Sequence, residues 1–219
     1  MTEKISENQK MLNLWAVILI VWSVYRYYFH LPDWFDEFIA KPIVFVAPVY
    51  FYIKKREKKE FFTAINWNLK PVASNLFFGF AIGLIFFITA LFGNYIKFQK
   101  FVFLPGKAIN LLNIFLIICL ALATSITEEI LSRGFVLKRL YEESKNIYTS
   151  SFFSSILFFF LHVPILFTNI KITGNLLLYF MVTDLLLSLT VSFIYLEKKD
   201  LNLPILVHLF YNLSIYFFT

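Results

Sequence analysis

Residues 72–96 of the chain read VASNLFFGFAIGLIFFITALFGNYI and contain no charged side chain. A helix needs about 20 mostly apolar residues to cross the roughly 30 Å hydrocarbon core of a bilayer. This stretch exceeds that minimum, so it predicts a helix that spans a membrane.

The remainder of the chain repeats this pattern. Of its 219 residues, 59% are hydrophobic and 21% aromatic, and the mean hydropathy is +0.72, whereas a soluble domain is about half apolar. Apolar runs cover residues 11–29, 34–53, 72–96, 108–127, 148–167, 176–196 and 203–218. We expect an all-α, polytopic transmembrane bundle of about seven spans. Residues 1–219 would form a single integral membrane domain, with N-terminal spans in 1–107 and core helices in 108–219.

The second run departs most from an ordinary span. Asp36, Glu37 and Lys41 interrupt its start, and Pro42 and Pro48 each remove a backbone hydrogen bond. We expect it to be short, kinked or partly interfacial. Charged residues near span ends can extend into the interface, so Arg26 and these three are expected to have structural roles.

Basic residues indicate the orientation, because cytoplasmic loops carry an excess of lysine and arginine. With seven spans, one side of the membrane collects 14 of the 20 basic residues: Lys4, Lys10, Lys54, Lys55, Arg56, Lys58, Lys59, Lys70, Arg133, Lys138, Arg139, Lys145, Lys198 and Lys199. The other side collects Arg26, Lys41, Lys97, Lys100, Lys107 and Lys171. This bias predicts a multi-pass plasma-membrane protein with a cytoplasmic N-terminus. The net charge of +6 is therefore interpreted as a topology signal, and no nucleic-acid partner is expected.

Two adjacent carboxylates follow the fourth run, in Thr127-Glu128-Glu129-Ile130-Leu131-Ser132-Arg133. Successive helical residues are rotated by about 100°, so Glu128 and Glu129 cannot share one face. Arg133 lies four residues after Glu129, a spacing that favours an ion pair, and Glu128 is left to point elsewhere. The alternative is a helix end that emerges into water with solvated charges.

Two later runs contain histidines. His162 follows an aromatic stretch in the fifth run, and His208 and Asn212 lie four residues apart, hence on one helical face, in the seventh. Each histidine alone could simply hydrogen-bond between helices. Together with Glu128, however, these groups are suited to activating a water and stabilising a tetrahedral intermediate.

These motifs resemble the CAAX protease and bacteriocin-processing family of intramembrane proteases, which includes the Rce1-type prenyl protein proteases. The family pattern is Glu-Glu-x-x-x-Arg, Phe-x-x-x-His and His-x-x-x-Asn/Asp on successive core helices. It is matched here in order by Glu128 to Arg133, Phe158 to His162, and His208 to Asn212. The resemblance covers roughly residues 108–219 and implies an Rce1-like core formed by the last four spans.

The resemblance also implies an activity, the hydrolysis of a peptide bond in a membrane-associated or secreted peptide. Glu128 would be the general base, and His162 would help to hold the water. His208 and Asn212 would donate hydrogen bonds to the oxyanion. The alternative is a non-catalytic membrane immunity or scaffold protein of the same fold, and a small proton-linked transporter ranks third.

The same resemblance implies that Glu129 and Arg133 brace the helix. Zinc is possible, with Glu128, His162 and His208 as ligands and one open position. The arrangement is not His-Glu-x-x-His, so a metal-free glutamic mechanism is favoured and no cofactor is expected.

Two features depart from the family pattern. The family commonly has an eighth span after the His-x-x-x-Asn helix, whereas this chain has seven residues after Asn212. Asp184, in the sixth run, belongs to none of the three motifs; we expect either a hydrogen-bonded packing residue or a substrate-cleft residue. The expected partners are the lipid bilayer and a peptide or protein substrate, whose identity the sequence does not specify.

Overall fold

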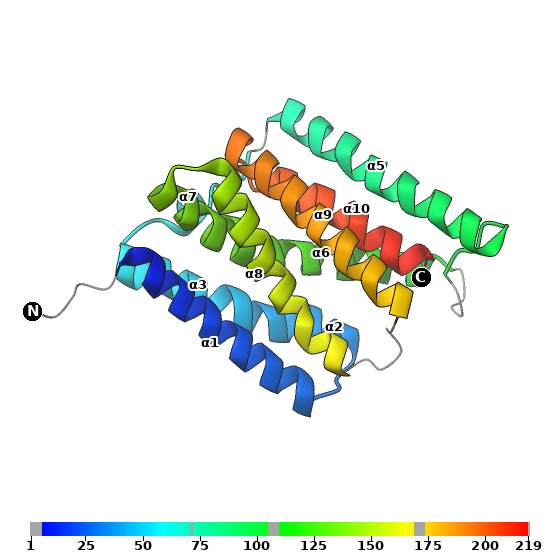
Figure 1. Cartoon of the computed structure of the whole chain (residues 1–219), viewed down its shortest axis with the longest axis horizontal. Coiled ribbons are helices and arrows are strands. Elements are labelled where there is room, and N and C mark those ends of the chain that lie inside the picture. The colour runs from blue at the N-terminus through cyan, green and yellow to red at the C-terminus, as the bar shows by residue number, and fades with distance from the viewer. Residues whose placement is uncertain (1–5, 71, 105–109, 169–173, 219) are drawn as a thin grey trace, which may run out of the picture.

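The computed structural model describes residues 6–70, 72–104, 110–168 and 174–218, and this part of the chain is helical with no strand (Figure 1). The prediction of an all-α bundle is confirmed. Lys4, Lys107 and Lys171, which entered the orientation count, lie outside the described residues.

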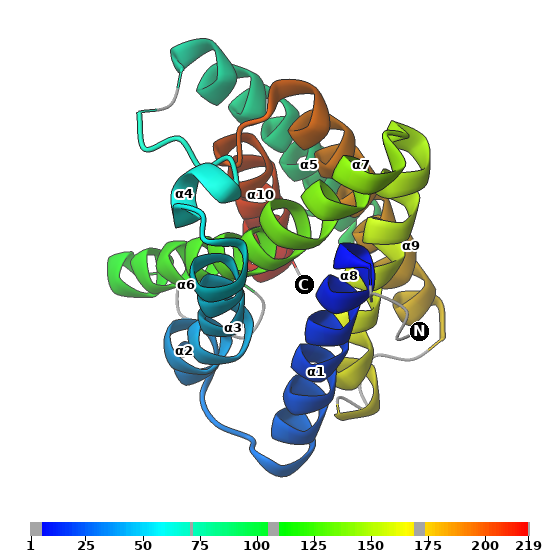
Figure 2. The same cartoon turned by 90° about the vertical axis from the view of Figure 1, so that its left-hand side faces the viewer.

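Six long helices form the bundle: α1 (Glu7–Tyr28), α5 (Ala73–Phe98), α6 (Leu111–Glu129), α8 (Ile147–Thr168), α9 (Gly174–Lys198) and α10 (Asn202–Phe218). In Figure 1, α1, α5, α8, α9 and α10 run in similar directions, and in Figure 2 α6 lies across them. Helix α10 packs against α5, α6 and α9 and is therefore central to the arrangement.

Side-chain caps mark where two of these helices begin. The Ser6 hydroxyl accepts a hydrogen bond from the Gln9 amide at the start of α1, and the Asn110 side chain accepts one from the Asn113 amide at the start of α6. Such caps satisfy amide groups that have no partner within the helix.

The second apolar run forms an irregular helical segment, residues 33–57. It contains α2 (Asp33–Phe35) and α3 (Ala47–Phe51), interspersed with wider π-helical turns, η1 (Asp36–Ala40), η2 (Pro42–Val46) and η3 (Tyr52–Glu57). The Lys41 amide donates to the Asp36 carbonyl, five residues back. Because prolines at 42 and 48 lack the N–H of a regular turn, wider turns in this segment are physically reasonable.

Helical structure continues beyond the fourth apolar run, which ends at residue 127. Helix α6 passes into η4 (Ile130–Leu137) and then α7 (Lys138–Ser144), giving one helical stretch of 34 residues from Leu111 to Ser144. Glu128 therefore lies near the middle of a long helix instead of at its end.

Four stretches among the described residues are long and apolar enough to cross a membrane: Glu7–Tyr28, Ala73–Ile96, Leu111–Ser144 and Ile147–Pro164. This is fewer than the seven predicted. Segment 33–57 contains charged residues, α10 has only 17 residues, and the described side chains of α9 include Asp184, Glu197 and Lys198. Composition and length alone therefore do not identify these three helices as spans.

The bundle has two apolar cores. The larger joins α1, segment 33–57, η4 and parts of α8 to α10, and the smaller joins α9 and α10 with partly buried residues of α5. Helix α5 packs mainly on α10, and its outer face exposes large apolar side chains such as Phe77 and Ile85. Such a face suits contact with lipid.

Candidate active site

The Glu-Glu-x-x-x-Arg motif is buried inside the bundle. Glu128 is 5% exposed, and Glu129 and Arg133 are fully buried. The alternative of a helix end with solvated charges is therefore wrong for these residues. Charged groups removed from water need partners, and the site is built from those partners.

Two imidazoles converge on Glu128. The Nε2 atom of His162, from α8, lies 3.6 Å from Oε2 of Glu128, and the Nε2 atom of His208, from α10, lies 3.7 Å from the same oxygen. These separations are too long for direct hydrogen bonds. The carboxylate oxygen has no hydrogen-bond partner among the described residues, so it presents an acceptor between two ring nitrogens.

The second nitrogen of His208 is fixed by the neighbouring glutamate. His208 Nδ1 lies 2.8 Å from Oε1 of Glu129. An ionised carboxylate only accepts hydrogen bonds, so Nδ1 carries the proton in the tautomer that this contact favours. The Nε2 atom of a neutral His208 is then an acceptor, and protonation of the ring makes it a donor.

His162 is oriented in a similar way. Its Nδ1 atom lies 3.3 Å from the Phe158 carbonyl oxygen, one turn earlier on α8, and 3.7 Å from Oδ2 of Asp184 on α9. The carbonyl can only accept a hydrogen bond, so this contact favours the tautomer with the proton on Nδ1, which leaves Nε2 as the acceptor facing Glu128. The Phe158 ring also packs against both imidazoles, with centroid distances of 4.8 Å to His162 and 5.7 Å to His208.

Glu129 and Arg133 form the ion pair that their spacing predicts, with Nη1 of Arg133 2.9 Å from Oε1 of Glu129. The other end of the guanidinium donates to Ser188 on α9, at 3.1 Å to its carbonyl and 2.7 Å to its hydroxyl. Its carbon lies 4.4 Å from the centre of the Phe158 ring. One side chain thus connects three helices.

Asn212 lies one turn beyond His208 on α10, as the spacing predicts. Its side-chain amide donates to the Ser125 hydroxyl on α6, at 3.1 Å. Ser125 precedes Glu128 by one helical turn, so the amide lies along the same face of α6 as the carboxylate.

Asp184 belongs to the same buried cluster. It is 1% exposed and approaches His162 from the side opposite Glu128. The sequence left open whether this residue serves packing or a cleft, and the structure places it beside a predicted site histidine.

The sequence interpretation missed one member of the cluster. Lys41, expected to extend to the interface, is 7% exposed, and its ammonium lies 2.8 Å from Oε1 of Glu128. Asp36 is buried as well and pairs with Arg26. The expectation that these charges reach water is wrong. A signal was present, because Lys41 follows Glu37 by four residues and a charge within a span is costly.

The Lys41 ammonium beside Glu128 disfavours a zinc ion on this carboxylate. No group of three histidine, cysteine, aspartate or glutamate side chains in the described part of the chain is arranged to hold a metal ion. A dication on Glu128 would lie beside the Lys41 ammonium, which already pairs with that carboxylate. Like charges at such a separation repel.

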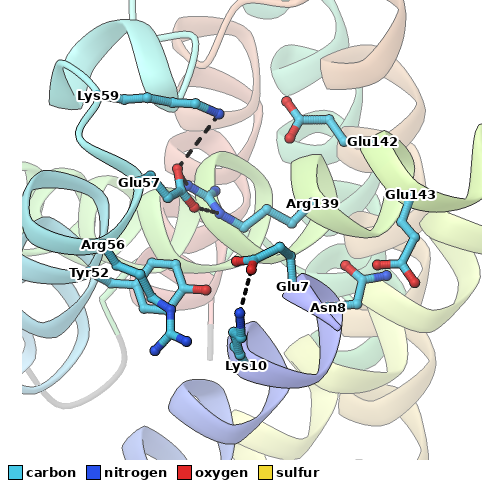
Figure 3. Close-up of a pocket in the computed structure, with 10 residues that line it drawn as sticks. All are labelled: Glu7, Asn8, Lys10, Tyr52, Arg56, Glu57, Lys59, Arg139, Glu142 and Glu143. Carbon is cyan, nitrogen blue, oxygen red and sulfur yellow. Dashed lines mark hydrogen bonds and ion pairs between the residues drawn. The ribbon is translucent and has the colours of Figure 1, made fainter. Parts of the chain in front are cut away.

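A separate cavity of about 590 Å³ lies at the end of the bundle where α1 begins (Figure 3). It is lined by charged side chains of α1, η3 and α7, and Glu128 is not among them. Glu57 pairs there with Arg139, and Glu7 with Lys10. We therefore place the candidate site at Glu128 and not in this cavity.

Comparison with known protein families gave a match for the second half of the chain. Residues 110–214 match the family model described as Type II CAAX prenyl endopeptidase Rce1-like. No curated protein and no solved structure matches the chain. The matched range contains all three motifs and excludes segment 33–57, which carries Lys41.

Proposed function

Because residues 110–214 form an Rce1-like domain, we propose that this membrane protein is an intramembrane endopeptidase that hydrolyses a peptide bond in a membrane-associated or secreted peptide. The observation that carries the proposal is the position of Glu128 Oε2, 3.6 and 3.7 Å from the Nε2 atoms of two histidines on different helices.

Water activation is assigned to Glu128 and His162. A water placed between Glu128 Oε2 and His162 Nε2 finds two acceptors, which orients its lone pair away from them. As the water oxygen attacks the carbonyl carbon, Glu128 takes one proton. When the C–N bond breaks, the protonated Glu128 returns that proton to the leaving amine.

Oxyanion stabilisation is assigned to His208 and Asn212. Hydrogen-bond donors aimed at developing charge contribute strongly where water is excluded. The Glu129 carboxylate fixes the ring through Nδ1, and Nε2 of His208 donates when the ring carries a second proton. Asn212 has two amide hydrogens, and only one is needed for its bond to Ser125.

Glu129 and Arg133 are assigned a supporting role. Arg133 holds the Glu129 oxygen that contacts His208, so the ion pair fixes the ring as well as the helix. Fixing the reacting groups before the reaction avoids reorganisation during it.

Sidedness and substrate are further parts of the proposal. The basic residues support a plasma-membrane protein with a cytoplasmic N-terminus. The bilayer and a peptide or protein are the proposed partners. Nothing in the residues of the site specifies a prenyl group, so a prenylated protein, a bacteriocin leader and a signalling peptide are all candidate substrates.

The test is peptide cleavage by the purified protein in detergent or proteoliposomes. A panel of prenylated and unmodified peptides is compared between wild type, Glu128→Gln and His162→Ala, with Glu143→Gln on the exposed surface of α7 as the control. General acid–base catalysis is worth about 10²–10⁴-fold, so both site variants should lose at least about 100-fold while the control keeps its rate. Equal cleavage by all four proteins would disprove the assignment. A cellular function that survives Glu128→Gln would instead indicate a binding role.

A further inference from the structure

Lys41 occupies an unusual place for a lysine in a membrane bundle. It lies in segment 33–57, between η1 and η2, and is 7% exposed. A charged side chain in a membrane helix costs at least about 2.5 to 3.5 kcal/mol on insertion scales. A lysine retained there is expected to have a specific partner.

The partners of Lys41 are two glutamates on different helical segments. Its Nζ lies 2.8 Å from Oε1 of Glu128 and 2.7 Å from Oε2 of Glu37. Glu37 is fixed in turn, because the Thr124 hydroxyl donates to its Oε2 at 2.6 Å. The ammonium is therefore held by a glutamate of its own segment and presented to α6.

This contact decides which oxygen of Glu128 is available for chemistry. Oε1 is occupied by the ammonium, whereas Oε2 faces His162 and His208. We infer that Lys41 is a positioning residue: it holds Glu128 by Oε1 so that Oε2 is directed at the water beside His162. The inference rests on the proposed function of Glu128 as general base.

Charge supports the same inference. Four carboxylates are clustered here, on Glu37, Glu128, Glu129 and Asp184. Arg133 pairs with Glu129, and Lys41 is the cation that contacts Glu128 in the described part of the chain. Its ammonium therefore compensates the charge of Glu128 at Oε1 and leaves Oε2 to the histidines.

A simpler role for Lys41 would be to join two helical segments. The chain offers a matched control, because Arg139 on α7 pairs with Glu57 at the end of segment 33–57 (Figure 3). The distances are 2.7 Å from Nε to Oε1 and 2.9 Å from Nη2 to Oε2. That pair joins segment 33–57 to the same long helix as Lys41 does, but it lines the cavity of Figure 3, to which Glu128 does not contribute.

The experiment compares Lys41→Met, Lys41→Arg and Arg139→Met with wild type in steady-state peptide cleavage. We expect Lys41→Met to lower kcat by about 10- to 100-fold with KM changed less than threefold, since a preorganised group is lost while the substrate contacts remain. Lys41→Arg should recover most of kcat. Arg139→Met should stay within about threefold of wild type. Equal effects of Lys41→Met and Arg139→Met, or a Lys41→Met enzyme with wild-type kcat, would overturn the inference.

A milder variant covers the case in which Lys41→Met does not fold. Thr124→Val removes the hydroxyl that fixes Glu37 and leaves every charge in place, and we expect kcat to fall by about three- to tenfold. An unchanged kcat would then refute the positioning role. Activity that survives Glu128→Gln would refute the proposed function itself, so the two failures are distinguishable.

Discussion

Arg133 is the side chain whose replacement should disturb this fold most. It is fully buried, and its guanidinium contacts Glu129, the backbone and hydroxyl oxygens of Ser188, and the Phe158 ring. Methionine fills a similar volume without a charge. Arg133→Met would leave the Glu129 carboxylate buried, in contact with His208 but without its cation.

The expected loss follows from these contacts. Breaking a buried ion pair by removing one partner costs about 3–5 kcal/mol. For chains of this size, each kcal/mol lowers the melting temperature by about 2–4 °C, so Arg133→Met should melt roughly 6–20 °C below wild type. Arg133→Lys keeps the charge but cannot reproduce the forked contact with Glu129 and Ser188, and should lose about half as much.

The assay is thermal unfolding in detergent micelles, followed by the helical signal. Lys55→Met is the control because its side chain is on the surface, where substitutions usually change stability by less than about 0.5 kcal/mol. We expect the order wild type, Arg133→Lys, Arg133→Met in falling stability. If Arg133→Met and Lys55→Met have the same melting temperature, the buried contacts of Arg133 do not stabilise the fold as argued.

Two further predictions concern the contact between α5 and α10 and whether peptide cleavage needs a metal ion. A Cβ at Gly83 on α5 would lie 2.6 Å from the Phe210 ring, whereas one at Gly79 would lie 3.1 Å from Leu203. Gly83→Ala should therefore lower the free energy of unfolding by about 1–3 kcal/mol, and Gly79→Ala should lower it by less. Equal melting temperatures of the two variants would contradict this packing. Peptide cleavage should be unaffected by EDTA or 1,10-phenanthroline. Elemental analysis should find less than one zinc per protein. If chelation abolishes cleavage and added zinc restores it, the metal-free mechanism is wrong.

Local spacing was sufficient to predict several features of this molecule. Apolar runs predicted the positions of the long helices, since a helix in lipid must satisfy its backbone within itself. The four-residue spacing predicted the pairing of Arg133 with Glu129 and put His208 and Asn212 on one face of α10. These are relations within one helix, where geometry is known in advance.

Relations between helices were not accessible in the same way. That His208 Nδ1 would meet Glu129 and His162 would lie beside Asp184 depends on how α6, α8, α9 and α10 pack, and no single-helix periodicity contains that information. The alternative of a helix end with solvated charges at Glu128 and Glu129 was wrong because polar residues within the motif were treated as signs of water. They are instead buried against one another, and the helix continues to Ser144.

Lys41 contacts the proposed base but lies outside the matched family motifs. The family match begins at residue 110, so a wall of the site contributed by segment 33–57 lies outside it. The general cost of a charge in a membrane helix applies equally to Lys41 and to Glu128, but only Glu128 belonged to a recognisable pattern. A buried cation beside the proposed base means that the three motifs alone do not define the site. An Rce1-like chain with the same motifs and an apolar residue in place of Lys41 should need another positive group at the oxygen that corresponds to Glu128 Oε1. A survey of such chains for that group would test whether the proposed base depends on a neighbouring cation.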